Sequence, residues 1–343
     1  MEKICITGGA GFVGSHLVDY VHRYYDDAEI VIVDNFSYAA DIDNIRATLA
    51  SPRVHLWRTS ITDETSMRRA LDGVDVVLHT AAESHVDNSY RTPDLFLETN
   101  TRGTAVLLRA AIAQGVRRFV HLSTDEVYGD NAAADVDEDS PARPTNPYAA
   151  SKAAAEMFID AYTTSYGLDT VRLRLNNLYG TRQYPEKLIP RAIADIAAGR
   201  RFPVHGSGAQ RRSFLSVADL CDAVDLVLQA GEPGATYNVG SADEYSVMEI
   251  VTAICRQLGV AAADAVAHGP DRPYNDSRYG VLRTRLEALG WRQRRHLLDD
   301  LPTLVDWYLR HGRPVPDAAA PIPLRRSARA THRCRAPLAS AGA

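Results

Sequence analysis

The amino-terminal segment of the sequence carries the pattern that most limits the possible folds. A short apolar run at residues 3–7 leads directly into the glycine-rich segment 8–14, and a helical pattern follows over residues 15–25. Glycines at such a turn let backbone N–H groups approach a pyrophosphate at the positive N-terminal end of the helix. The order of strand, glycine turn and helix therefore predicts a βαβ unit that binds a dinucleotide.

The end of the second strand pattern indicates which dinucleotide binds. Residues 30–33 form another apolar run, which ends at Asp34. A carboxylate at this place accepts hydrogen bonds from ribose hydroxyls and repels a 2′-phosphate. The sequence therefore predicts NAD as the cofactor in preference to NADP.

Strand and helix patterns continue to alternate up to about residue 175. The expected elements are strands at 54–57, 74–79, 118–122 and 169–174, and helices at 64–71, 93–114 and 148–166. Apolar strands rich in Val, Ile and Leu that are separated by helices are typical of a parallel sheet covered on both faces. The fold class we expect is α/β, with a Rossmann-type doubly wound parallel sheet.

Beyond residue 175 the pattern loosens, which indicates a smaller mixed α/β substrate-binding domain. Residues 176–180 look loop-like, and residues 304–310 close the globular part. Between them we expect strands at 202–206, 211–215 and 236–240, and helices at 217–230, 246–258 and 284–289. The predicted division is residues 1–175 with 213–240 for the dinucleotide-binding domain, 176–212 with 241–312 for the second domain, and 313–343 for a disordered tail rich in Pro, Ala, Arg and Ser.

Two pairs of residues carry the expected chemistry. Tyr148 and Lys152 are four apart on one helical face, and a fixed ammonium lowers the pKa of a nearby phenol, so that the phenolate can act as a base. Asp125 and Glu126 follow the strand at 118–122, and adjacent acids in such a loop can differ in pKa and divide into acid and base.

Composition excludes several classes of partner and compartment. The net charge is −5, with 43 acidic and 38 basic residues, which argues against nucleic acid or a membrane surface as the main partner. The four cysteines lack the spacing of metal ligands or disulfides and are interpreted as reduced thiols. No apolar run is long enough for a membrane span, and the strand close to Met1 leaves no room for a signal peptide. We therefore expect a cytoplasmic location and no metal site.

The motifs resemble those of the extended short-chain dehydrogenase/reductases, which act on nucleotide sugars. The resemblance spans roughly residues 1–310 and rests on Gly8-x-x-Gly11-x-x-Gly14, on Tyr148-x-x-x-Lys152, and on a hydroxyl at Ser123 or Thr124. Within this superfamily, residues 81–87, 123–129 and 185–190 are similar to the nucleoside-diphosphate-glucose 4,6-dehydratases.

The resemblance implies a reaction in three stages at one hexose. Tyr148 takes the proton of the C4 hydroxyl, Glu126 removes the C5 proton, and Asp125 protonates the departing C6 hydroxyl. The implied catalytic residues are Thr124, Asp125, Glu126, Tyr148 and Lys152. The implied NAD-binding residues are Gly8, Gly11, Phe12, Val13, Gly14, Asp34, Asn35, Ser37, Ser60, Ile61, Thr80, Ala81, Ala82, Thr99, Ser123, Tyr148 and Lys152.

The resemblance also implies a site for dTDP-glucose or UDP-glucose. Its residues are Ser84, Thr124, Asn177, Glu186, Lys187, Leu188, Pro203, His205, Arg212, Asn238, Asn275 and Tyr279. If folding brings them together, four basic residues from separate segments could clamp the diphosphate, although each alone is also typical of a surface charge: Lys187, Arg212, Arg272 and Arg278. His205, the pair Ser213-Phe214 and Asn275 look like the eukaryotic-type sequences, including plant enzymes that act on UDP-glucose, so both thymidine and uridine stay open.

Other functions are compatible with the same motifs. A 4-epimerase or a 5,6-dehydratase of the superfamily is the alternative enzyme, and an NAD-binding regulatory protein is the alternative outside catalysis. The family also implies a homodimer joined through helices 93–114 and 148–166, although the apolar faces of these helices could equally be core.

Overall fold

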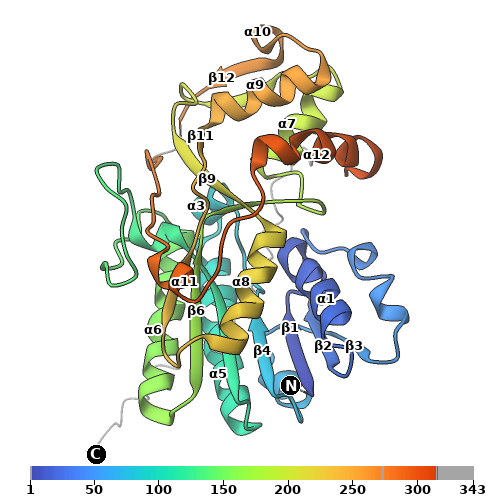
Figure 1. Ribbon diagram of the computed structural model, residues 1–343, viewed down its shortest axis with the longest axis vertical. Helices are drawn as coiled ribbons and strands as arrows, with labels where there is room; N and C mark the ends of the chain where they lie inside the picture. The colour runs from blue at the N-terminus through green and yellow to red at the C-terminus, as the bar shows by residue number, and fades with distance from the viewer. Residues whose placement is uncertain (1, 272–273, 314, 316–343) are drawn as a thin grey trace, which may run out of the picture.

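The computed structural model describes residues 2–271, 274–313 and 315. Within these residues, seven parallel strands form the main sheet, in the spatial order β10-β6-β5-β4-β1-β2-β3 (Figure 1). The strands are β1 Lys3–Thr7, β2 Glu29–Asp34, β3 Val54–Arg58, β4 Val76–His79, β5 Arg118–Thr124, β6 Asp169–Leu175 and β10 Thr236–Val239. The order is that of a doubly wound Rossmann-type sheet, which confirms the predicted fold class.

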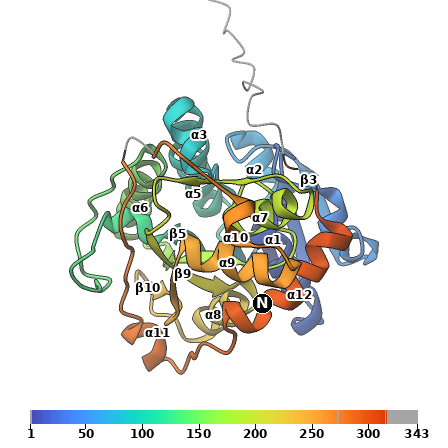
Figure 2. The same ribbon diagram turned by 90° about the horizontal axis from the view of Figure 1, so that it is seen from above.

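Helices cover both faces of this sheet because its strands are apolar on both sides. Ile4 and Ile6 of β1 pack toward α1 and α8, whereas Cys5 packs on the opposite face with residues of α2 and α5. Figure 2 shows α5 and α6 on one side of the sheet and α8 on the other. The helices around the sheet are α1 Phe12–Tyr24, α2 Glu64–Ala70, α3 Val86–Arg91, α4 Pro93–Phe96, α5 Gly103–Ala113, α6 Pro147–Tyr166, α8 Val217–Ala230 and α11 Thr284–Ala288, with short 3-10 turns at Ile42–Asn44, Thr48–Ala50 and Asp125–Tyr128.

The smaller unit lies beyond the carboxyl ends of the main strands (Figure 1). It contains a three-stranded sheet in the order β11-β9-β7 and the pair β12-β8. A separate apolar core joins its helices to these strands. Its elements are β7 Asn177–Tyr179, β8 Phe202–His205, β9 Arg211–Ser216, β11 Glu244–Ser246, β12 Val266–Gly269, α7 Leu188–Ala197, α9 Val247–Leu258, α10 Ala262–Ala265 and α12 Leu297–His311.

The small sheet differs from the sequence prediction at two places, the segment 176–180 and the proposed domain boundary at residue 213. The expected loop at 176–180 contains β7, which pairs with β9 in the register Asn177↔Phe214. A run of three residues is too short to show the alternation of a strand, so only its pairing reveals it. The whole of β9 lies in the small sheet, although the predicted division placed residues from 213 onward in the dinucleotide-binding domain. The division into domains stays a prediction.

The expected helix at 93–114 is interrupted. It consists of α4, a π-helical stretch at Leu97–Arg102 and α5. Asn100 lies in the π-helical stretch, and its amide bonds both the N–H and the carbonyl of Glu83, at 2.8 and 2.9 Å. The wider turn allows this side chain to reach the loop after β4, which the helical periodicity alone did not indicate. The last helix, α12, begins at Leu297, before the segment 304–310 that was expected to close the globular part, and it contains Pro302.

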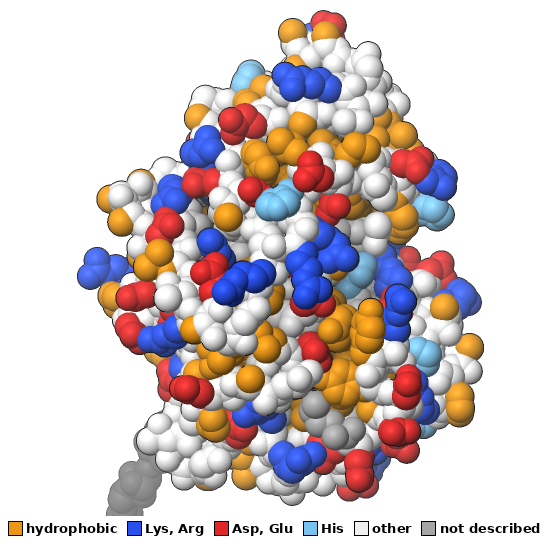
Figure 3. All heavy atoms as spheres, viewed as in Figure 1, with side chains coloured by type: hydrophobic (Ala, Val, Ile, Leu, Met, Phe, Trp, Pro, Cys, Tyr) orange, Lys and Arg blue, Asp and Glu red, His pale blue; other side chains and the backbone are white. Residues whose placement is uncertain are grey.

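The surface of the described residues carries charges of both signs (Figure 3), and the described cysteines lie in the interior. Acidic and basic side chains are interspersed over the face in Figure 3. Among the helices of the described residues, none combines the length and the apolar character required to cross a bilayer. Cys5, Cys221 and Cys255 are buried free thiols. The predicted disordered tail lies outside the described residues, apart from Arg313 and Val315.

Candidate active site

A cavity of about 480 Å³ lies where the carboxyl ends of the main strands face the smaller unit. Doubly wound sheets bind ligands at this edge, next to the point where the strand order reverses, which here falls between β1 and β4. Each of the predicted NAD-binding residues contributes to the lining: Gly8, Gly11, Phe12, Val13, Gly14, Asp34, Asn35, Ser37, Ser60, Ile61, Thr80, Ala81, Ala82, Thr99, Ser123, Tyr148 and Lys152. The predicted substrate residues also line it, except Asn238.

The glycine turn between β1 and α1 has no room for side chains. A Cβ at Gly14 would lie 2.1 Å from the carbonyl oxygen of Gly8, and a Cβ at Gly8, whose φ is +69°, would lie 2.8 Å from Ala81 Cα. Glycine is therefore required at both positions. Since α1 begins at Phe12, the turn leaves its first backbone N–H groups at the cavity, as an anion-binding helix start requires.

Asp34 fixes the turn to the end of β2. One carboxylate oxygen accepts the N–H of Ala10 at 2.9 Å, and the other accepts the N–H of Phe36 at 2.8 Å. Burial raises the pKa of Asp34, and these two bonds oppose that rise because they favour the ionised form. The carboxylate lines the cavity, as the sequence predicted for a group that meets a ribose.

The surroundings of Tyr148 differ from the sequence prediction. Burial and the nearby carboxylate of Glu126 raise the pKa of this phenol, whereas a hydrogen bond with Thr124 lowers it. The sequence predicted that Lys152 would lower the pKa directly. Lys152 Nζ instead donates to the Leu122 carbonyl at 2.7 Å and lies 3.2 Å from His121 Nε2.

The structure also lowers the pKa of Lys152 itself. Complete burial lowers its pKa to about 8, and Glu156 opposes that shift. His121 is also buried, and the positive charge of Lys152 adds to burial in lowering the pKa of this imidazole far below its ordinary value. His121 is therefore neutral and lies next to the ammonium group of Lys152.

The two neighbouring acids occupy different environments. Asp125 is buried, and its carboxyl accepts the amide of Asn176 at 2.6 Å and the hydroxyl of Thr124 at 3.3 Å. Burial, with the adjacent charge of Glu126, raises the pKa of Asp125 to about 7. Glu126 lines the cavity and accepts the amide of Asn146 at 2.8 Å. Near neutral pH, Asp125 can therefore carry a proton to donate.

The structure distinguishes the two hydroxyls that the sequence left as alternatives. The hydroxyl of Ser123 donates to the buried carboxylate of Glu156 at 2.5 Å, and that carboxylate also accepts two nitrogens of Arg174. The hydroxyl of Thr124 is bonded to Tyr148. Thr124 is therefore the hydroxyl beside the phenol.

Polar residues from the smaller unit approach the other end of the cavity. Lys187 Nζ donates to the carbonyl of Ser84 at 2.7 Å, and Glu186 accepts the hydroxyl of Tyr38 at 2.9 Å. The guanidinium of Arg212 lies 4.6 Å from the centre of the Tyr279 ring, in a cation–π contact. The remaining predicted lining residues on this side are Asn177, Leu188, Pro203, His205 and Asn275.

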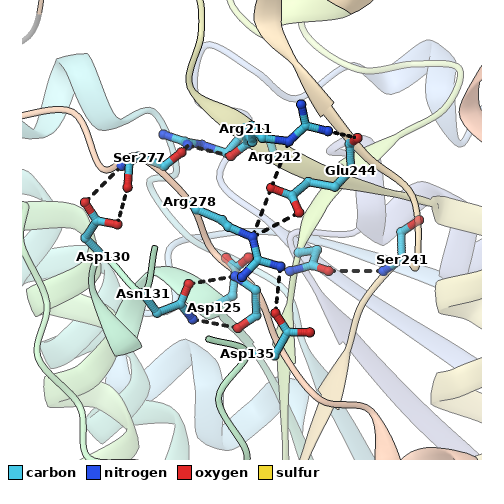
Figure 4. A network of polar contacts seen from close by, with 12 residues as sticks. Asp125, Asp130, Asn131, Asp135, Arg211, Arg212, Ser241, Glu244, Ser277 and Arg278 are labelled. Atoms are coloured by element: carbon cyan, nitrogen blue, oxygen red, sulfur yellow. Dashed lines mark hydrogen bonds and ion pairs between the residues drawn. The ribbon is translucent and has the colours of Figure 1, made fainter. Parts of the chain in front are cut away.

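Three predicted residues among those that the structure describes are absent from the cavity lining, namely Asp125, Asn238 and Arg278. Asn238 is fully buried, where it accepts the hydroxyl of Tyr128 at 2.7 Å. Arg278 is absent from the lining and forms ion pairs with Glu244 and Asp135, as Figure 4 shows. Arg272 lies outside the described residues. A sequence position shows the type of side chain but not the groups that surround it in the fold.

Several lining residues were missed by the sequence analysis. Burial and the charge of Glu186 raise the pKa of Glu83 to about 7. Its position inside the motif at 81–87 was a usable signal. Asn146 precedes Pro147 at a helix start, which is the pattern of an N-cap residue. The other missed polar residues include His85, which lies in the same motif, and Asn176, Tyr184 and Arg191.

A glycine turn on a doubly wound sheet, with a tyrosine and a lysine one helical turn apart at the strand ends, defines an oxidoreductase fold of the extended short-chain dehydrogenase/reductase type. The chain belongs to the GDP-mannose 4,6 dehydratase family, whose model matches residues 5–300. Within it, the chain is similar to nucleoside-diphosphate-glucose 4,6-dehydratases.

Three relatives show the extent of the similarity. The trifunctional UDP-glucose 4,6-dehydratase/UDP-4-keto-6-deoxy-D-glucose 3,5-epimerase/UDP-4-keto-L-rhamnose-reductase RHM2 of Arabidopsis thaliana is 40% identical over 313 residues, which are 90% of this chain and 47% of that protein. The chain thus spans about half the length of this relative. The dTDP-glucose 4,6-dehydratase of Streptomyces niveus is 39% identical over 311 residues, or 89% of this chain and 92% of that protein. The crystal structure of DesIV, a dTDP-glucose 4,6-dehydratase from Streptomyces venezuelae with NAD bound, has a TM-score of 0.88 and 38% identity, and the match covers 90% of this chain and 97% of that one.

Proposed function

We propose that this protein is an NAD-dependent nucleoside-diphosphate-glucose 4,6-dehydratase, a hydro-lyase that forms a 4-keto-6-deoxy sugar and water. The observation that carries the proposal is the pair Asp125 and Glu126 beside Tyr148. One acid is buried with a pKa near neutrality, and the other faces the cavity. Elimination of water needs one group that gives a proton and one that takes a proton, and this pair supplies both.

The residues present fit NAD. The glycine turn would receive the pyrophosphate and Asp34 the adenosine ribose, since a side chain at Gly14 would collide with the backbone of Gly8. When bound, NAD⁺ accepts a hydride from C4 of the sugar and returns it to C6, so that it is regenerated in each cycle. NAD-bound DesIV, with which the chain shares its fold, supports this assignment.

The residues of the chain would act on the sugar in sequence. Thr124 holds the C4 oxygen, and Tyr148 removes its proton as the C4 ketone forms. The ketone acidifies the C5 proton, which Glu126 accepts. Asp125 gives its proton to the C6 hydroxyl, which leaves as water, so that Glu126 ends protonated and Asp125 ionised. Proton return to C5 restores Glu126. Tyr148 releases the C4 hydroxyl proton to solvent and Asp125 takes up one proton, so that both groups return to their starting states.

The diphosphate would be held by two of the four basic residues that the sequence suggested. Lys187 and Arg212 line the cavity, and Arg191 lines it as well. Both dTDP-glucose and UDP-glucose fit this proposal, since relatives of each kind are similarly close.

A panel of nucleotide sugars that vary in base and in the C2 substituent tests the function. We expect loss of water and a new C6 methyl group with dTDP-glucose or UDP-glucose, measured by mass and proton spectra. Epimerisation would conserve mass, and a 5,6-dehydratase would lose water without forming the methyl group. Absence of turnover with every sugar would favour an NAD-binding regulator.

A homodimer is part of the proposal. Large apolar side chains are exposed on α6 and on the neighbouring π-helical stretch, where Met157, Leu97 and Phe158 are 66%, 52% and 43% exposed. We call these three residues the α6 patch. Clusters of this kind on adjacent helices are typical of an interface between subunits, here with a second copy of the chain.

The proposed compartment is the cytoplasm. Cys5, Cys221 and Cys255 are buried free thiols in three separate elements, a pattern that suits a reducing compartment.

A further inference from the structure

We propose that Asn146 is a positioning residue, which holds the carboxylate of Glu126 at the cavity in a fixed relation to Tyr148. The inference rests on the proposed function, because it assumes that Glu126 is the base that removes the C5 proton. It concerns a residue that neither touches the reacting atoms nor belongs to the motifs that define the reaction.

The side-chain amide of Asn146 makes two hydrogen bonds in opposite directions. Its Oδ1 accepts the backbone N–H of Ala149 at 2.8 Å, which caps the N-terminus of α6. Its Nδ2 donates to Glu126 Oε2, also at 2.8 Å. The amide orientation follows from these partners, because a flipped amide would set N–H against N–H and oxygen against carboxylate.

The position of Asn146 in the chain makes this link rigid. Asn146 is 7% exposed, and the next residue is a proline at the first helical position, which fixes the start of α6. Tyr148 lies two residues further along the same helix. One side chain therefore fixes the proposed C5 base relative to the element that carries the phenol.

The bond to Asn146 also favours the ionised form of Glu126. An N–H donor stabilises a carboxylate, and the stabilisation is larger where water is excluded. The titratable groups that interact electrostatically with Glu126 are Asp125 in the same 3-10 turn, Tyr148 of α6, and Tyr279. Asp125 and the phenols oppose a negative charge at this place when they are ionised, so the amide donor counteracts them.

Two substitutions separate the capping bond from the positioning bond. Ser and Asp are N-cap residues as good as Asn, so Asn146→Ser and Asn146→Asp retain the start of α6 and the placement of Tyr148. In Asn146→Ser the side chain has no amide N–H and is too short to reach the carboxylate of Glu126. Asn146→Asp has the shape of Asn but places a carboxylate against Glu126.

The experiment follows the oxidation and elimination steps separately in a single turnover with dTDP-glucose and UDP-glucose. C4 oxidation is read from the absorbance of the reduced cofactor, and C5 deprotonation from deuterium uptake at C5 in heavy water. We expect both variants to oxidise C4 at close to the native rate, whereas deuterium uptake and loss of water fall roughly 10-fold in Asn146→Ser and about 100-fold in Asn146→Asp. The reduced cofactor should accumulate.

A double-mutant cycle with Glu126→Gln completes the test. If Asn146 acts through Glu126, Asn146→Asp should add no further loss in the Glu126→Gln background. Native elimination rates in Asn146→Asp, with a strong loss in Glu126→Gln, would overturn the positioning role alone. Equal loss of oxidation and elimination in Asn146→Ser would show that Asn146 does not act on the elimination step in particular, and would also overturn the positioning role. An unchanged rate in Glu126→Gln would overturn the proposed role of Glu126 itself.

Discussion

At the scale of single residues, burial gives two adjacent carboxyl groups different protonation. Asp125 is 3% exposed, so its charged form has lost most of its hydration, and its pKa rises to about 7. Glu126 lies at the cavity wall with a hydrogen-bond donor from Asn146. The proposed acid and base are thus one residue apart in the chain but differ in solvation.

The first prediction concerns activity and pH. Since Asp125 must be protonated to act as the acid, turnover should fall as the pH rises through the pKa of about 7. Asp125→Asn should lose about 100-fold or more in the rate of water loss, and its remaining activity should lack this alkaline decline. Initial rates across a pH series measure both effects. Asp264→Asn, which changes an exposed acid, is the control, and a native profile in Asp125→Asn would contradict the assignment.

The second prediction concerns stability and pH. The pKa of Asp125 is raised on folding from its ordinary value of 3.8, so the folded state binds a proton that the unfolded state has released. Stability should therefore decrease as the pH rises from about 4 to about 7. Asp125→Asn removes this loss, so the variant should melt at a higher temperature than the native protein above neutral pH. Thermal unfolding at acid and alkaline pH measures the difference, and an unchanged or lower melting temperature at alkaline pH would refute it.

At the scale of elements, α6 connects the site to the sheet. Asn146 caps its start, Tyr148 and Lys152 line the cavity, and Glu156, one turn further on, lies in the interior. Glu156 forms a buried pair with Arg174 of β6, with an N···O distance of 2.6 Å. Arg174 in turn lies 4.6 Å from the centre of the Tyr128 ring. This pair fixes the depth of α6 against the sheet and thereby the position of the phenol.

The third prediction follows from that pair. Glu156→Gln would leave the buried guanidinium of Arg174 without its counter-charge, and the free energy of unfolding should drop by about 3–5 kcal/mol. Glu98→Gln, which removes the acid of an exposed ion pair with Arg102, should cost about 0.5 kcal/mol or less. Denaturant unfolding of both variants gives the comparison. If the free energy of unfolding fell by similar amounts in Glu156→Gln and Glu98→Gln, the buried ion pair would contribute no more to stability than the exposed one.

At the scale of the whole molecule, two units share one cavity. The larger unit supplies the glycine turn, Glu126 and the phenol of Tyr148, and the smaller unit supplies Lys187 and Arg212. Neither unit contains a complete site. The three residues of the α6 patch are exposed and do not line the cavity, so a partner could bind there without filling it.

The fourth prediction tests that surface. Met157→Glu places a charge in the α6 patch and should convert a dimer to monomers, as measured by light scattering coupled to size-exclusion chromatography. Leu309→Glu is the matched control, because Leu309 is 54% exposed on α12, away from the patch. A monomeric native protein, or a Met157→Glu variant that stays dimeric, would exclude the patch as the interface.

Much of the fold followed from local patterns in the chain. The alternation of apolar strands with helices predicted the main sheet, because the period of a strand or helix is set by residues that are neighbours in sequence. The small sheet was harder to predict. β7 has three residues, and only its partner β9, far along the chain, makes it a strand. The π-helical stretch at Leu97–Arg102 depends likewise on the distant contact between Asn100 and Glu83.

The sequence by itself determined the residue types at the strand ends, namely the glycine turn, the acid pair, and a tyrosine four residues before a lysine. Tertiary structure decided what each group meets. It directed Lys152 to the carbonyl of Leu122, buried Asn238 away from the cavity, and joined Asn146 to Glu126. The physical reason is that hydration and hydrogen bonding depend on groups that folding brings together from distant parts of the chain, and these set the pKa and the orientation of a side chain.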